Sequence, residues 1–209
     1  MFLAAACVLA QGQDVEINPA KQTPMAPQSR STSIKPYHSI TSRQRLSWFL
    51  DSTVGPETLT VGLLSAGIGT GRNAPKEYGS HWEGFGKRYA MRLTGVSTGN
   101  AMEAGVGALW GEDPRYFRTY RQPFSGRIRN VVVMTFLAHN REGALMPAYA
   151  RYTATAGNNF LSNTWRADSE ANNRDAAIRT LYGFLGLMGK NAFTEFWPDI
   201  KASVFHRKD

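Results

Sequence analysis

Small residues recur at helical spacing over a long stretch of this chain, and this pattern constrains the fold more than any other feature. Pairs of glycine or alanine four positions apart are Gly95 and Gly99, Ala101 and Gly105, Ala104 and Ala108, and Gly107 and Gly111. Gly183, Gly186 and Gly189 repeat the pattern near the C-terminus. Each glycine inside a helix costs about 1 kcal/mol relative to alanine. We expect these helices to recover that cost by close approach to a neighbour, so the sequence predicts tightly packed helices.

Helix starts and breaks predict an all-α fold, a single bundle of about five helices. Ser42 is suited to cap the first helix, residues 55–56 break the chain after it, and residues 112–114 end the longest helix. Segment 127–136 is ambiguous, because three consecutive valines favour a strand while the neighbouring segments favour helix. The expected helices cover residues 42–54, 56–69, 77–111, 147–165 and 169–196. The last is expected to end at 197–198 and to turn these residues to the core: Ile178, Leu181, Leu185, Met188, Ala192 and Phe196.

The two ends of the chain are predicted to lie outside the folded domain. Residues 1–10 form a short apolar run that ends like an export-signal cleavage site, and they hold the only cysteine, Cys7. Residues 11–41 are polar and contain several prolines, which predicts a disordered linker or tether. We expect a helical domain over 42–200 and a basic tail over 201–209. The expected location of this exported protein is the periplasm or the outer membrane.

The charge of the chain favours an anionic partner. The formal net charge is +8 at pH 7, and most of the 24 basic residues are arginines, which suit bidentate contacts with phosphate. We expect an anionic lipid or envelope surface as partner, or a second copy in a homo-oligomer, and no nucleic acid. The alternative is that the arginines lie on ordinary solvated helix faces. No stretch reaches the ~18 to 20 apolar residues of a spanning helix.

Motifs that could carry chemistry are weak. Residues 95–99 match the G-x-S-x-G pattern of a serine nucleophile, but they lie in a helical stretch with no strand before them. The histidines are scattered, and we expect no metal and no cofactor. Glu83, beside Trp82 and near Tyr89, is the one candidate catalytic residue, because apolar neighbours raise the pKa of a carboxyl group. It would serve as general acid in a cell-wall (peptidoglycan) hydrolase. The alternative for Glu83 is an ion pair with Lys87 one turn later.

The densest group of charged and aromatic residues, here named the aromatic corner, follows the longest predicted helix. Its members are Trp110, Asp113, Pro114, Arg115, Tyr116, Phe117 and Arg118. Pro114 ends the helix, which leaves Asp113 at the negative end of the helix dipole unless a cation compensates. We expect Asp113 to pair with Arg115 or Arg118 and the rings of Tyr116 and Phe117 to turn inward. The alternative is a membrane-interface anchor, where tryptophan and tyrosine are enriched.

Three segments carry a family resemblance: Glu-Gly-Phe-Gly-Lys-Arg-Tyr at 83–89, Asp-Pro-Arg-Tyr-Phe at 113–117 and Glu-Phe-Trp-Pro-Asp-Ile at 195–200. With them the chain resembles, over roughly 42–208, a family of uncharacterised exported helical proteins of the acidobacterial type. The resemblance implies no established activity and therefore no catalytic residue. The sequence as a whole predicts a non-enzymatic cell-envelope protein with a structural or interaction role, associated with a membrane. A hydrolase that uses Glu83 is the alternative.

Overall fold

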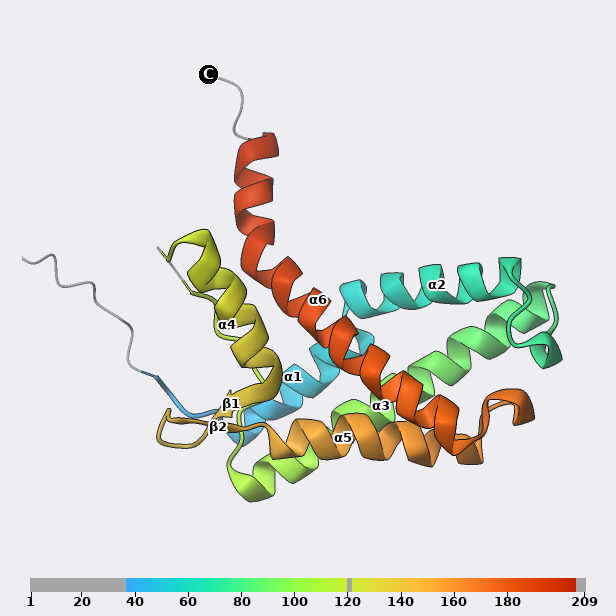
Figure 1. Cartoon of the computed structure of the whole chain (residues 1–209), viewed down its shortest axis with the longest axis horizontal. Coiled ribbons are helices and arrows are strands. Elements are labelled where there is room, and N and C mark those ends of the chain that lie inside the picture. The colour runs from blue at the N-terminus through green and yellow to red at the C-terminus, as the bar shows by residue number, and fades with distance from the viewer. Residues whose placement is uncertain (1–36, 120–121, 206–209) are drawn as a thin grey trace, which may run out of the picture. The chain divides into compact units, whose positions relative to one another are not determined.

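The computed structural model describes residues 37–119 and 122–205. The predicted export signal, residues 11–36 of the predicted linker and residues 206–209 lie outside the described residues. Within the described part there are six α-helices and one small hairpin, and the predicted all-α bundle is confirmed. The elements are α1 (Ser42–Val54), α2 (Pro56–Gly71), α3 (Trp82–Trp110), α4 (Phe124–Phe136), β1 (Leu137–His139), β2 (Leu145–Pro147), α5 (Tyr149–Leu161) and α6 (Asn173–Phe205) (Figure 1).

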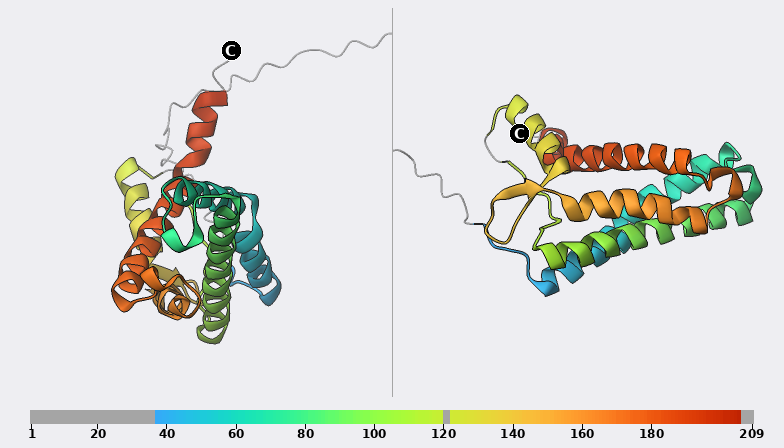
Figure 2. Two further views of the ribbon diagram at one scale, coloured as in Figure 1. Left: turned by 90° about the vertical axis from the view of Figure 1, so that its right-hand side faces the viewer. Right: turned by 60° about the horizontal axis from the view of Figure 1, so that its bottom comes forward.

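The helices pack around α3. Helices α1, α2 and α5 lie against α3, and α6 lies against α5 and α4; Figure 2 shows α3, α5 and α6 side by side. Helix α1 starts with a capping box, in which the Thr41 hydroxyl accepts from the Gln44 N–H and the Gln44 side chain accepts from the Thr41 N–H. The cap is therefore Thr41, one residue before the predicted Ser42. The predicted break is confirmed, since Gly55 separates α1 from α2 and Pro56 takes the first position of α2.

Close packing through small residues is confirmed for part of the glycine set. A Cβ atom added to Gly99 would lie 3.1 Å from Nδ2 of Asn158 on α5, and one added to Gly107 would lie 2.8 Å from a guanidinium nitrogen of Arg45 on α1. A Cβ atom on Gly95 would meet no other atom within 4 Å. The same open space surrounds Gly105, Gly186 and Gly189. The contact between α3 and α5 thus explains Gly99, and the Arg45 side chain of α1 explains Gly107. The open glycines need another explanation.

The ambiguous segment 127–136 is helical. It lies within α4, where Val131 and Met134 are buried, because packing against α6 overrides the local strand preference of the valines. The two strands that follow form a short antiparallel pair, with Ala138 opposite Met146.

Helix α6 continues past its predicted end at 197–198 and reaches Phe205, so the start of the predicted tail is helical. A proline inside a helix removes a backbone donor and presses on the preceding turn. Here the Glu195 carbonyl accepts a hydrogen bond from Arg118 Nε at 2.8 Å and another from Arg127. The carbonyl that loses its helical donor to Pro198 is that of Thr194, and the two arginines hold the adjacent Glu195 carbonyl of the same turn. Figure 1 shows α6 bent toward its C-terminal end.

Candidate functional site

The aromatic corner is built around a buried ion pair. Asp113 is fully buried, and both of its carboxylate oxygens accept from Arg115, at 2.7 Å in the shortest contact. The predicted pairing of Asp113 with an arginine is confirmed. The Tyr37 hydroxyl donates to the same carboxylate at 3.0 Å, and burial, together with the Asp113 charge, raises the pKa of Tyr37 to about 12. The prediction that residues 11–41 lack packed contacts is therefore wrong at Tyr37, whose ring also stacks on His139.

A second buried carboxylate, Glu195 of α6, holds the other half of the corner. It accepts from the Tyr116 hydroxyl at 2.7 Å, from Arg127 Nε at 3.0 Å and from the backbone and hydroxyl of Thr119. Burial first, and then the Glu195 carboxylate, raise the pKa of Tyr116. The sequence analysis missed Glu195, although its spacing of seven residues from Met188 places it on the predicted core face of its helix.

Glu112 connects the corner to the start of α5. Its buried carboxylate accepts from the backbone N–H groups of Ala150, at 2.8 Å, and Arg151, at 3.4 Å. It thus caps a helix whose own N-cap residue, Ala148, has no capping side chain. Burial raises the pKa of Glu112, and the two N–H donors and the Arg151 charge counteract this rise. Arg151 in turn pairs with Glu103 at 3.0 Å, so buried polar contacts tie the end of α3 to α5.

The remaining corner residues divide between packing and exposure. Pro114 is buried, and the half-buried Phe117 ring packs edge-on against Tyr37 and His139. Trp110 is the exception, because 54% of its surface is exposed. These contacts support a structural junction more than a ligand site, since most polar groups of the corner satisfy one another.

Glu83 lies in a different environment from the predicted one. Its side chain is 79% exposed and pairs with Lys87 at 2.7 Å, which is the alternative given for this residue. The hydrogen bond and charge of Lys87 lower the pKa of Glu83. The predicted upward shift is therefore wrong. Ser97 of the G-x-S-x-G pattern lies in the middle of α3, as the packing interpretation requires.

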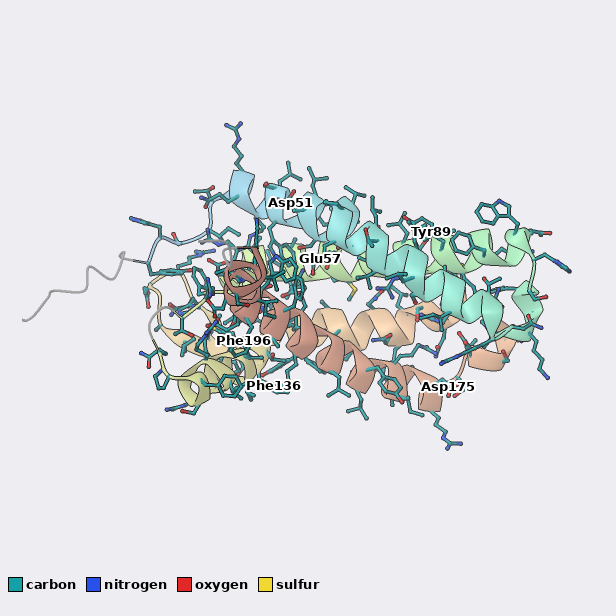
Figure 3. All side chains as sticks on the ribbon, turned by 90° about the horizontal axis from the view of Figure 1, so that it is seen from above. Asp51, Glu57, Tyr89, Phe136, Asp175 and Phe196 are labelled. Carbon is teal, nitrogen blue, oxygen red and sulfur yellow. The ribbon has the colours of Figure 1, made fainter. Side chains whose placement is uncertain are left out.

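A groove of about 560 Å³ lies among α2, α3, α5 and α6. Figure 3 shows α2 and α6 on the same side of the domain, with α5 visible between them. One face of α3 lines the groove with Arg88, Arg92, Gly95, Gly99 and Glu103, at spacings of three or four residues. The other helices contribute small and amide side chains: Ser65, Ala66, Gly69, Ala154, Thr155, Asn158, Asn159 and Gly183.

Arg88 gives the groove a positive charge that no carboxylate offsets. It is buried, and its guanidinium donates to the backbone carbonyls of Ala74 at 2.9 Å, Pro75 at 2.8 Å and Gly79 at 2.6 Å. No ion pair of Arg88 occurs in the described part of the chain. These backbone acceptors satisfy the guanidinium donors without neutralising the charge of Arg88.

Arg92, one turn further along α3, has no hydrogen bond or ion pair among residues 37–119 and 122–205, and its Nε is buried without a partner. Burial lowers the pKa of Arg92, as expected for a cation that lacks a compensating charge. Arg92 therefore offers free donors to the groove.

Two arginines line the end of the groove beside α6. Arg179 donates to the backbone carbonyls of Glu170 and Asn159 and to Oδ1 of Asn163, and its Nε is buried without a partner. Arg166 pairs with the Glu170 carboxylate at 3.1 Å. Of the two acids that line the groove, Glu170 is therefore engaged by Arg166, and Glu103 is engaged by Arg151 as described above.

Asn158 adds an unpaired acceptor. Its Nδ2 donates to the Gly95 carbonyl at 2.9 Å, which fixes the orientation of the amide. Its Oδ1 is then left buried without a partner. The groove thus combines unpaired donors on Arg92 and Arg179 with one unpaired acceptor. The sequence analysis missed this site, although Arg88 and Arg92 share a helix face with Gly95.

Large apolar side chains lie mainly on the outside of the described helices. The largest fully buried side chains are all polar: Glu112, Asp113, Thr135 and Glu195. The buried apolar residues are mostly alanine. On α2, Val61, Leu64 and Ile68 are exposed along one stripe, and no charged residue follows Glu57 within this helix.

Helix α6 carries a second exposed stripe. Leu181 and Leu185 are 66% and 59% exposed, and Ile178 is 38% exposed, so the predicted core face of this helix is wrong at these three positions. The buried positions of α6 are instead taken by Ala176, Asn191 and Glu195, because polar contacts and close helix approach organise the interior. The exposed stripes of α2 and α6 are together called the apolar outer surface below.

Comparisons with known proteins find no matching family model, no matching curated protein and no matching solved structure. No helix of the described chain has the length and apolarity needed to cross a membrane. In the described ranges, no group of three or more histidine, cysteine, aspartate or glutamate side chains is placed to hold a metal ion.

Proposed function

We propose that this chain is a non-enzymatic envelope protein that lies on an anionic membrane surface through its apolar outer surface. The observation that supports this is the inverted distribution of side chains, with polar groups buried and leucines of α2 and α6 exposed. Soluble monomers rarely expose extended apolar patches, and such patches mark contact sites. An amphipathic helix that lies in the interfacial plane buries its apolar side in the acyl boundary.

Charge supports lipid as the occupant of this surface. The formal net charge of the chain is +8, and exposed Arg72 and Lys76 directly follow α2. Basic residues beside an apolar face are attracted to anionic headgroups, at about 1 kcal/mol for each residue near the surface. Exposed apolar side chains on two helices then add the hydrophobic part of the binding energy.

Vesicle flotation with the full chain tests this proposal. Binding to vesicles of phosphatidylglycerol and phosphatidylcholine should exceed binding to phosphatidylcholine alone, and Leu64→Glu combined with Ile68→Glu should weaken it by at least about tenfold. The control is Leu145→Glu in β2, an equally exposed leucine outside the apolar outer surface, which should change binding little. If Leu64→Glu and Ile68→Glu leave vesicle binding intact but dissociate an oligomer in gel filtration, the surface is an interface between copies and the proposal is wrong.

A further inference from the structure

The groove among α2, α3, α5 and α6 is a second site, separate from the apolar outer surface. We propose that it binds a phosphate ester that carries a hydroxyl group, such as a glycerol phosphate, with Arg92 as the main phosphate ligand and Asn158 as the hydroxyl acceptor. The ligand is either a free glycerol phosphate or the headgroup of a phosphatidylglycerol-type lipid, which share this chemistry.

The charge of the groove selects an anion. Arg88, Arg92 and Arg179 make no ion pair among the described residues, and the lining acids Glu103 and Glu170 are already engaged by arginines. Arg88 is held by three backbone carbonyls and contributes a fixed positive potential. Arg92 keeps its donors free, and guanidinium donors match phosphate oxygens in a bidentate geometry.

The unpaired Asn158 oxygen adds a requirement that a bare phosphate does not meet. Because the Asn158 amide donates to the Gly95 carbonyl, its buried Oδ1 can act only as an acceptor, and Asn158 is one of the residues that line the groove. A buried acceptor without a donor is costly, and a hydroxyl group on the ligand would supply that donor. A phosphate ester with a hydroxyl group therefore complements both the free cation and the free acceptor.

The space in the groove is adequate for such a ligand. Its volume of about 560 Å³ lies within the range typical of small-molecule sites. Gly95 borders it, and a Cβ atom there would meet no other atom within 4 Å. A larger side chain at position 95 would consequently occupy ligand space without disturbing the packing of α3 on its neighbours.

Calorimetric titration of the full chain with sn-glycerol 1-phosphate and with inorganic phosphate tests the inference. Arg92→Met should weaken glycerol phosphate binding by about 10- to 100-fold, and Gly95→Leu should abolish it. Asn158→Leu should weaken glycerol phosphate binding but leave the weaker binding of inorganic phosphate nearly unchanged. There are two controls. Arg129→Met replaces an exposed arginine of α4, and Gly105→Leu replaces an open glycine of α3 outside the groove. Both variants should bind glycerol phosphate like the unsubstituted chain. Thermal melting shows that each variant is folded.

A vesicle arm identifies the source of the ligand. If the headgroup is the ligand, Arg92→Met and Gly95→Leu remove the preference for phosphatidylglycerol over phosphatidylcholine and leave binding to phosphatidylcholine vesicles unchanged. The double variant Leu64→Glu with Ile68→Glu instead lowers binding to both kinds of vesicle. If glycerol phosphate binds and the vesicle preference is unaffected, the ligand is the free ester. The inference is overturned if neither arm separates the groove variants from Arg129→Met and Gly105→Leu, and the proposed membrane association is unaffected by that result.

Discussion

Replacing Glu195 with glutamine tests whether this buried carboxylate is the main link between α6 and the aromatic corner. Its two oxygens accept from Tyr116 at 2.7 Å, from Arg127 at 3.0 Å and from Thr119, and its side chain is fully buried. Glutamine keeps one acceptor oxygen and replaces the other with an NH₂ group that cannot accept, so at least one donor loses its partner. A hydrogen bond to a charged group contributes about 1.5–3 kcal/mol. We therefore expect the free energy of unfolding to fall by about 2–4 kcal/mol.

Urea denaturation and thermal melting, both followed by circular dichroism, measure this loss. For a domain of this size, each kcal/mol shifts Tm by about 2–4 °C, so Tm should fall by about 4–16 °C. The control is Asp199→Asn, which removes an exposed partner of the same Arg127 and should change Tm little, because solvent screens such a pair. If Glu195→Gln costs no more than Asp199→Asn, the buried carboxylate is not the link and the reasoning is refuted.

Three further expectations concern packing and pH. Gly99→Leu should lower the free energy of unfolding, measured by urea denaturation, by about 1–3 kcal/mol, because the new side chain meets Asn158 at close range. Gly105→Leu, whose side chain would face open space, should not lower it. Equal losses of stability in the two variants would contradict this reasoning. Burial lowers the pKa of His139 from 6.5 in the folded protein. The imidazole is therefore protonated at a higher pH in the unfolded chain than in the folded protein, and the free energy of unfolding falls as pH drops below about 6.5. His139→Gln should make the free energy of unfolding, measured by urea denaturation at successive pH values, fall less steeply over this range. Burial raises the pKa of Tyr37 from 10.0 to about 12, so stability is lost between pH 10 and 12, and a Tyr37→Phe variant with the same alkaline melting profile would argue against this shift.

Local signals in the sequence were sufficient for five of the six helices, although not for all of their ends, and for one contact of the corner. Glycine followed by proline at 55–56 marked the first break because proline fits the first turn of a helix. The pair of Asp113 with Arg115 followed from the position of a carboxylate at a negative helix end. Both inferences involve residues close in sequence, where geometry is set by the backbone itself.

Contacts between distant residues could not be predicted in this way. Tyr37 reaches Asp113 from a segment whose composition is that of a linker. Glu195 meets Tyr116 and Arg127 across more than 60 positions of sequence. Burial of a carboxylate depends on donors brought by other helices, and the amphipathic pattern of α6 only showed that it has an apolar side. That side faces outward at Leu185 because the interior positions are already filled by polar contacts.

The glycines of α3 serve two different purposes. These purposes account for part of the stability that glycine costs inside a helix. Gly99 allows α5 to approach, and Gly107 leaves room for the Arg45 side chain of α1. At Gly95 no atom of the described residues lies within 4 Å of an added Cβ atom, so alanine there would stabilise the helix by about 1 kcal/mol. Gly105 is equally open and lies outside the groove, so a ligand cannot account for it. Gly95, however, borders the groove one turn from Arg92, whose unpaired charge also destabilises the free protein. Gly95 and Arg92 thus both lower the stability of the free protein, and they lie on the same face of α3. Such a cost is expected at a binding site, where a bound ligand supplies the contacts that the free protein lacks.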